Sequence, residues 1–263
     1  MNGPTVPPHD ARAGGRLRGI LVLPLAVLFG FLYPLCLIPP AVLTPKWFQP
    51  RRQAAVANWG RFLLWLWGIR LEVHGKENHE GEGARILLFN HVSILDLMVL
   101  SAAWGEHDTV VYKKEFGRIP IIGRCMRALD FVAVDRGDRS KARESISTAA
   151  AYIREKGFAV WIAPEGTRSR EGGLQDFKMG PFHMALASGA ALVPTISRGI
   201  EQISPHGTFI VRPGVVRVDY LAPISTDGWD RRELRERATE VRQVFLQYVP
   251  PAPGSEGHEP PLD

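Results

Sequence analysis

His91 and Asp96 are the first residues whose types and spacing suggest chemistry. They follow the apolar run Arg85–Asn90 and stand five positions apart. On one regular helix, residues at this spacing point about 140° away from each other and do not meet. They meet if His91 lies in a turn before a helix and Asp96 lies in that helix's first turn. The carboxylate would then hold one ring nitrogen and leave the other as a general base, although structural histidine–aspartate pairs use the same spacing.

The segment Ala163–Ser169, APEGTRS, is a second candidate. It follows an apolar run typical of a buried strand, and Gly166 and Thr167 suit a tight turn. Sites in α/β proteins gather at the carboxyl ends of strands. Arg168 would project a guanidinium there, a group shaped to bind phosphate through two hydrogen bonds. The alternative is an ordinary surface turn with a charged tip.

Basic residues accompany two further β-type runs. Lys113 ends the run TVVYK, and Arg136 follows the run FVAV. Together with Arg168, these side chains would line a groove for an anionic group, and a solvated basic face is the alternative. Both interpretations depend on where the strands end.

The elements that must position these residues alternate along the chain. Strand-like runs cover 70–75, 85–90, 109–113, 131–134, 158–164 and 191–197, and helical patterns cover 93–104, 138–157, 180–189 and 229–249. This alternation predicts an α/β domain. The segment 208–221 is interpreted as a hairpin around Pro213–Gly214. Ser93 stands where it can cap the helix that carries Asp96.

The N-terminal part differs in composition from the rest of the chain. Residues 1–18 are interpreted as a basic mobile tail, and Gly19–Pro45 contains 27 residues without a charge. About 20 apolar residues suffice to cross a bilayer as a helix, so this segment is expected to meet a membrane. Prolines and the basic residues on both flanks favour a helix–turn–helix anchor over 19–69, turning near Pro39–Pro40 in one leaflet. A true span and a cleaved signal peptide are the alternatives.

Composition limits the kinds of partner and cysteine site that this chain can have. The chain has 263 residues, a net charge of +5 and a pI of about 9.4, which favours anionic partners such as a membrane surface. The apolar N-terminus and the lack of a basic-aromatic binding motif argue against nucleic acid. Cys36 and Cys125 show neither metal-site spacing nor a disulfide framework.

Four blocks in this order resemble the 1-acylglycerol-3-phosphate acyltransferase family, the PlsC-like glycerolipid acyltransferases. The resemblance covers about 70–221 and rests on NHVSILD, KKEFGRIPIIG with VDR, PEGTRS, and LVPT. It implies catalytic roles for His91 and Asp96. The implied substrate-binding residues are Lys113, Arg136, Glu165, Gly166, Thr167 and Arg168, and the blocks also include Pro120, Gly123 and Pro194. Ala163 and Pro181 depart from the family pattern and put the shape of the acceptor pocket in question.

The resemblance also implies a fold and a reaction. The fold is a mixed sheet flanked by helices, with an N-terminal two-helix membrane anchor and an acyltransferase domain over 70–250. The composition of 251–263 separately predicts a disordered tail. His91 would take the proton of a lysophospholipid hydroxyl that attacks an acyl thioester. The donor would be acyl-CoA or acyl-carrier protein, with no metal or bound organic cofactor. The expected location is the cytoplasmic face of the inner membrane, in contact with membrane lipid.

Two alternatives remain at this point. The acceptor could be another lysolipid, such as lyso-ornithine lipid, with the same chemistry. The protein could instead bind lipid on this fold without turnover, which the joint presence of His91, Asp96, Glu165 and Arg168 disfavours.

Overall fold

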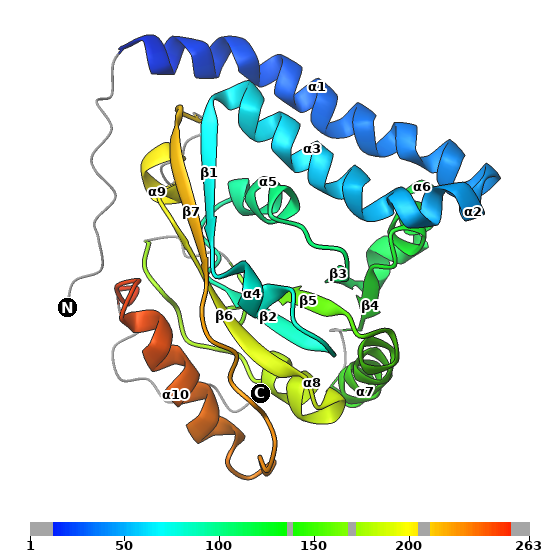
Figure 1. The fold of residues 1–263 in the computed structure, drawn as a ribbon, viewed down its shortest axis with the longest axis vertical. Helices are drawn as coiled ribbons and strands as arrows, with labels where there is room; N and C mark the ends of the chain where they lie inside the picture. Colours follow the sequence, from blue (N-terminus) through cyan, green and yellow to red (C-terminus); the bar gives the residue numbers. More distant parts are fainter. Residues whose placement is uncertain (1–12, 136–138, 168–171, 205–210, 254–263) are drawn as a thin grey trace.

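The computed structural model describes residues 13–135, 139–167, 172–204 and 211–253 (Figure 1). Arg136 and Arg168, two of the expected phosphate-binding residues, lie outside these ranges. So do residues 1–12 and 254–263, which make up most of the two expected tails.

A seven-stranded sheet forms the centre of the molecule, with strand order β1-β7-β6-β2-β5-β3-β4. The strands are β1 (Ile69–His74), β2 (Arg85–Phe89), β3 (Asp108–Lys113), β4 (Val132–Val134), β5 (Ala159–Ile162), β6 (Ala191–Arg198) and β7 (Gly214–Tyr220). Neighbours pair in parallel except β6 and β7, which are antiparallel. The sheet is therefore mixed, as expected.

Helices cover both faces of the sheet. They are α1 (Ala13–Leu43), α2 (Pro45–Phe48), α3 (Arg52–Trp67), α4 (Lys76–His79), α5 (Leu95–Ala102), α6 (Pro120–Ala128), α7 (Arg139–Lys156), α8 (Gly180–Ser188), α9 (Ile200–Ile203) and α10 (Leu234–Leu246), with short 3-10 helices η1 (Gln49–Arg51) and η2 (Lys114–Arg118). Alternate residues of β2 point to opposite faces. Leu87 and Phe89 join the core cluster shared with α3 and α5, whereas Ile86 and Leu88 join the one shared with α7, α8 and α10. All four side chains are buried, which explains the uninterrupted apolar run.

The N-terminal helix differs from the expected hairpin. α1 begins at Ala13, inside the expected basic tail, and continues through Pro39 and Pro40 to Leu43. The chain turns at Thr44 instead. Thr44 precedes Pro45, and the proline ring disfavours helical geometry in the residue before it. The part Leu21–Leu43 is long and apolar enough to cross a membrane.

The second helix of the expected anchor belongs to the core of the α/β domain. Leu63, Leu64 and Trp67 of α3 are buried in the same cluster as the sheet residues Leu87 and Trp161. In Figure 1, α3 lies between α1 and the rest of the domain. The prediction of a separate anchor over 19–69 was therefore only partly right, because α1 alone is mainly exposed.

The expected hairpin around Pro213–Gly214 lies partly outside the described residues, because the structure does not describe 205–210. In the described part, residues 211–213 form no strand, and β7 begins at Gly214. β7 pairs with β1 in parallel and with β6 in the antiparallel direction, so its antiparallel neighbour is β6. The sequence pattern also did not predict the short helices α4 and α9 or the helix α6.

Candidate active site

The candidate site lies at the carboxyl ends of β2, β5 and β3. His91 follows β2, Glu165 follows β5, and Lys113 ends β3. Trp161 pairs with both Leu87 and Val110, so Lys113 stands level with Asn90. Two strand spacings separate these positions, or about 10 Å. Segments far apart in the sequence therefore meet at one edge because their strands are parallel.

His91 and Asp96 form the expected pair. His91 Nδ1 lies 2.6 Å from Asp96 Oδ2, which also accepts the backbone N–H groups of Val92 at 2.8 Å and Ser93 at 3.0 Å. Burial raises the pKa of the Asp96 carboxyl, while these hydrogen bonds act in the opposite direction. Since Nδ1 faces the carboxylate, the neutral ring presents Nε2 as an acceptor for a proton.

The turn between β2 and α5 brings the two side chains together. Ser93 Oγ accepts the backbone N–H of Leu95 at 3.0 Å, and the Asp96 N–H bonds to the Ser93 carbonyl at 3.2 Å. Ser93 therefore orients the start of α5, although the N-cap position belongs to Ile94 and not to Ser93 as expected. The Ser93 hydroxyl also lies 3.3 Å from Ser204 Oγ. His91 sits before the helix and Asp96 in its first turn, which gives the five-residue spacing its geometry.

Asn90 fixes the other side of this turn. Its side-chain amide donates to the Ser197 carbonyl at 2.9 Å and accepts the Ser197 N–H at 2.8 Å. The buried amide thus extends the β2–β6 ladder by one side-chain pair. Sequence reasoning missed this role, although a buried-type strand ending in asparagine directly before histidine was a usable signal.

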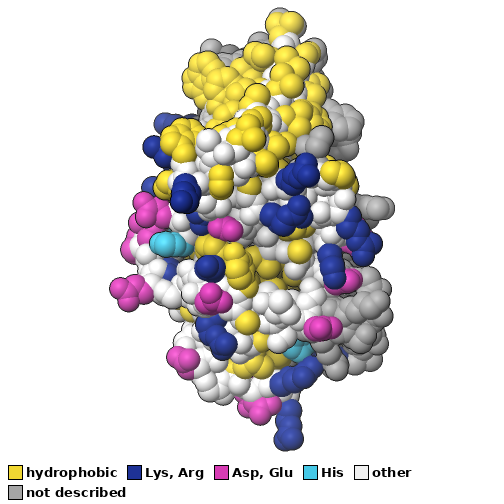
Figure 2. Space-filling view, turned by 90° about the vertical axis from the view of Figure 1, so that its right-hand side faces the viewer, with side chains coloured by type: hydrophobic (Ala, Val, Ile, Leu, Met, Phe, Trp, Pro, Cys, Tyr) yellow, Lys and Arg dark blue, Asp and Glu magenta, His cyan; other side chains and the backbone are white. Residues whose placement is uncertain are grey.

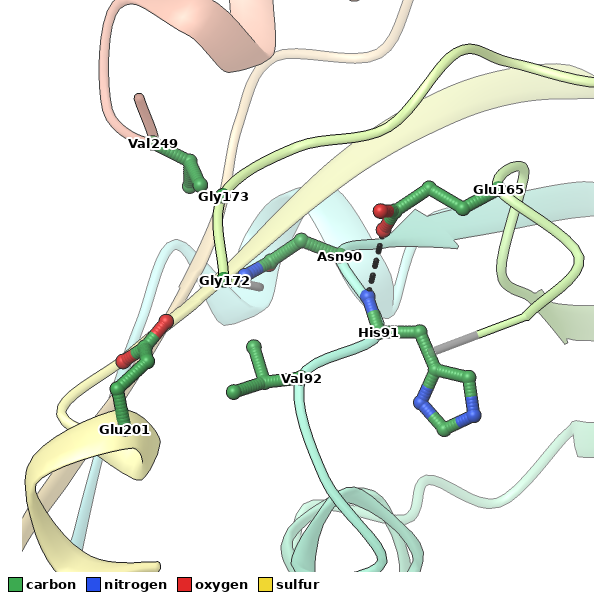
Figure 3. A pocket seen from close by; sticks show the side chains of 8 residues that line it. All are labelled: Asn90, His91, Val92, Glu165, Gly172, Gly173, Glu201 and Val249. Atoms are coloured by element: carbon green, nitrogen blue, oxygen red, sulfur yellow. Dashed lines mark hydrogen bonds between the residues drawn. The ribbon is translucent and has the colours of Figure 1, made fainter. Parts of the chain in front are cut away.

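Glu165 joins two loops from beneath the site. Its Oε1 accepts the His91 N–H at 2.8 Å (Figure 3). Its Oε2 accepts the Gln175 N–H at 2.9 Å. Burial raises the pKa of this carboxyl to about 7, with the two backbone hydrogen bonds opposing the shift. Glu165 therefore positions the backbone of the turn that carries His91. The sequence did not predict its contact with Gln175.

Gly166 makes the turn that presents Glu165. Its φ is +71°, a left-handed conformation that glycine adopts without strain, and its N–H bonds to the Ala163 carbonyl at 3.1 Å. A Cβ here would lie 2.9 Å from Cδ of Lys178. Thr167 follows as an exposed residue of the same turn.

A small pocket lies behind the His91 backbone. Asn90, Val92, Glu165 and Glu201 are among its lining residues. Figure 3 shows the imidazole and Glu201 on opposite sides of the backbone through His91 and Val92. The ring therefore points away from this pocket, and the pocket packs beneath the catalytic turn.

Lys113 is exposed at the same edge, with its Nζ 4.0 Å from Glu115 Oε2. The second sequence block continues from it through η2 into α6. Pro120 stands in the first turn of α6, and Gly123 is required because a Cβ would collide with the Gly117 carbonyl oxygen. Pro194 of the fourth block lies in β6, level with Leu88.

Metal-binding geometry is not found within the described residues. No group of three or more His, Cys, Asp or Glu side chains there could hold a metal ion. Among the described residues, the site offers an imidazole, a carboxylate that holds its Nδ1, and the ammonium group of Lys113 at the same sheet edge.

Known proteins match this chain in sequence and fold. A family model described as Acyltransferase matches residues 70–198. The 1-acyl-sn-glycerol-3-phosphate acyltransferase of Escherichia coli (strain K12) is 30% identical over 209 residues, covering 77% of this chain and 83% of the relative. That of Limnanthes douglasii is 32% identical over 191 residues, covering 73% of this chain and 67% of the relative. The chain belongs to the 1-acylglycerol-3-phosphate acyltransferase family.

A solved structure matches the fold of this acyltransferase. The crystal structure of the 1-acyl-sn-glycerophosphate (LPA) acyltransferase PlsC from Thermotoga maritima aligns with a TM-score of 0.71 and 21% identity, over 88% of this chain and 93% of that one. The predicted fold class and family are thus confirmed.

Proposed function

We propose that this acyltransferase moves a fatty acyl group from a thioester to the free sn-2 hydroxyl of 1-acyl-sn-glycerol-3-phosphate, which gives phosphatidic acid. The observation that carries the proposal is the His91–Asp96 pair at 2.6 Å, held at the carboxyl edge of a sheet that also presents Lys113. The names of the relatives support the same acceptor. Acyl-CoA and acyl-carrier protein are both donors compatible with this chemistry.

His91 acts as the general base. Its Nε2 takes the proton of the acceptor hydroxyl as the oxygen attacks the thioester carbonyl, and a new C–O bond forms. When the C–S bond breaks, the imidazolium returns the proton to the leaving thiolate. Asp96 holds Nδ1 and stabilises the imidazolium in between. A covalent acyl-enzyme is unnecessary because the thioester is already activated.

In this proposal the acceptor phosphate is bound by Lys113 at this edge together with Arg136 and Arg168, which lie outside the described residues. Lys113 ends β3, Arg136 comes directly after Asp135, and Arg168 comes directly after Thr167. Arginine suits phosphate because its planar guanidinium donates two parallel hydrogen bonds. Holding the phosphate places the hydroxyl against the thioester, and such positioning can contribute several kcal/mol of a barrier.

Membrane association follows from the substrates and from α1. Acceptor and product are lipids, and α1 carries the apolar stretch Leu21–Leu43. We place the enzyme on the cytoplasmic face of the membrane, where acyl thioesters are available.

The test is an acyl-transfer assay with purified full-length protein in detergent. Labelled acyl-CoA, and in a parallel reaction labelled acyl-carrier protein, is supplied with 1-acylglycerol-3-phosphate. Labelled phosphatidic acid from the parent, absent with His91→Ala, supports the proposal. If product forms only when lyso-ornithine lipid is supplied in place of 1-acylglycerol-3-phosphate, the proposed acceptor is wrong. If no product forms with either donor and either acceptor, the proposal is overturned.

A further inference from the structure

The segment from η2 through α6 exposes hydrophobic and basic side chains together. Phe116, Ile119 and Ile122 are 49%, 43% and 40% exposed. Arg118, between Phe116 and Ile119, and Arg124, two residues after Ile122, are also exposed and form no ion pair within the described part of the chain. A soluble surface rarely gathers large apolar groups in this way without a partner.

This segment is also continuous with the apolar surface of α1. α6 packs against α1 and η2, and Cys125 and Ala128 of α6 pack against the core cluster that includes Ala26 of α1. Figure 2 views the side on which Figure 1 places α2 and α6. It shows hydrophobic side chains covering the upper end of the molecule, where α1 lies, and Lys and Arg side chains just below them.

We infer that η2 and α6 form a second membrane contact beside α1, and that this second contact docks on anionic lipid. An amphipathic helix with apolar and basic side chains lies in the plane of a bilayer interface, its apolar groups among the acyl chains and its cations at the lipid phosphates. Exposed arginines beside exposed apolar side chains match an anionic leaflet, whose phosphates bind the guanidinium groups while its acyl chains take up the apolar groups.

The contact also determines how the lipid substrate reaches the site. This consequence rests on the proposed function. η2 begins directly after Lys113, which ends β3 at the catalytic edge. Docking of η2 and α6 therefore turns the edge that carries His91 toward the leaflet. A lysophospholipid could then reach the base by lateral diffusion, without leaving the membrane.

Depth measurements on the full-length protein test the contact. A cysteine at Ile119, in a Cys36→Ser/Cys125→Ser chain, carries an environment-sensitive nitrobenzoxadiazole label. A matched label at Tyr248, which is 37% exposed and follows α10, is the control. With phosphatidylglycerol-containing vesicles, we expect a blue shift at position 119 and several-fold greater quenching by lipid-attached nitroxides than at 248. Equal quenching at the two positions would overturn the inference.

Charge substitutions give an independent readout. Arg118→Gln/Arg124→Gln should reduce quenching at position 119 in anionic vesicles but not in phosphatidylcholine vesicles. Arg232→Gln/Arg235→Gln is the matched control and should change neither, because the exposed Arg232 lies just before α10 and the exposed Arg235 lies in its first turn. A loss that is the same in both vesicle types would contradict an anionic-lipid contact.

Activity separates this inference from the proposed function. Phe116→Ser/Ile119→Ser/Ile122→Ser should keep its acyl-transfer rate in detergent micelles and lose it several-fold in vesicles. An inactive parent in micelles would contradict the proposed function but leave the depth measurement interpretable. If the parent is active and the triple variant has the same acyl-transfer rate as the parent in vesicles, the link between docking and substrate access is overturned.

Discussion

At the scale of residues, one carboxylate oxygen organises the catalytic turn. Asp96 Oδ2 accepts the His91 ring N–H and the backbone N–H groups of Val92 and Ser93. The same contacts thus fix the tautomer of the base and the backbone that carries it. Glu165 adds a second tether through the His91 N–H.

Removing the base should abolish turnover without unfolding the protein. General-base catalysis typically contributes about 10²–10⁴-fold, so His91→Ala should lose activity in that range. Its imidazole is partly exposed, and its removal leaves the backbone contacts to Asp96 in place. Acyl-transfer rates together with thermal unfolding measure both effects. Activity within threefold of the parent would contradict the assignment.

Asp96→Asn should be both less active and less stable. An amide in place of the carboxylate weakens three hydrogen bonds, each stronger when the acceptor is charged. The site is buried, so we expect a loss of about 1–3 kcal/mol in the free energy of unfolding. Denaturant unfolding checks this value, and His91→Ala, which spares the backbone contacts, is the comparison.

Glu165 should make stability depend on pH. Its pKa is about 7 in the folded protein against an ordinary value of 4.5. Folding therefore favours the protonated form, and this group's contribution is fully present below about pH 4.5 and is lost as pH rises through 7. The shift corresponds to about 3 kcal/mol.

Glu165→Gln removes this titration. The free energy of unfolding of the variant, measured from pH 4.5 to 8, should decline less with rising pH than that of the parent. Identical slopes for parent and variant would show that Glu165 does not titrate in this window.

At the scale of elements, a close helix–helix approach holds α5 and its catalytic end. Gly60 of α3 faces the backbone of α5, and a Cβ there would lie 2.6 Å from the Met98 carbonyl oxygen. The two helices cannot separate locally without disturbing the shared core. The position of Asp96 therefore depends on a glycine that lies far from the site in sequence.

Gly60→Ala should destabilise the protein by about 1–3 kcal/mol through overpacking. Gly30→Ala in α1 is the matched control, since nothing lies within 4 Å of its added Cβ. Alanine favours helix by up to about 1 kcal/mol over glycine, so the control should be neutral or stabilising. Thermal or denaturant unfolding distinguishes the two, and equal effects would mean that the α3–α5 contact relaxes freely.

At the scale of the whole molecule, α1 has two unlike faces. Ala26 is buried, and the Phe29 ring packs at a tilt against Phe62 of α3, with 4.1 Å between the ring centroids. Leu21, Leu28 and Phe31 on the outer face are 69%, 55% and 72% exposed. One face therefore belongs to the folded domain and the other is available to lipid.

Substituting the outer face should weaken membrane binding without unfolding the domain. Leu28→Ser/Phe31→Ser removes two large apolar groups, each contributing about 1.5–3 kcal/mol when buried. Vesicle co-sedimentation should show a large loss of bound protein, with an unchanged unfolding midpoint in detergent. Full binding by this variant would assign the anchoring to other surfaces.

The sequence by itself determined most of the elements and the pairing of His91 with Asp96. Period-two and helical patterns are local, so β2, β5, α7 and α10 were found near their observed bounds. The four blocks also identified the family before any geometry was known. The turn that joins His91 to Asp96 needs only six consecutive residues, which is why its form could be deduced.

Tertiary structure decided what depends on contacts between distant segments. The contacts of Asn90 with Ser197 and of Glu165 with Gln175 join loops that no local pattern connects. The sequence of α3 predicted a membrane helix because a helix in a bilayer and a helix in a protein core are both rich in apolar residues. Only the packing of α3 against α5 shows which environment it occupies. β7 likewise became an internal strand because β1 pairs with its free edge.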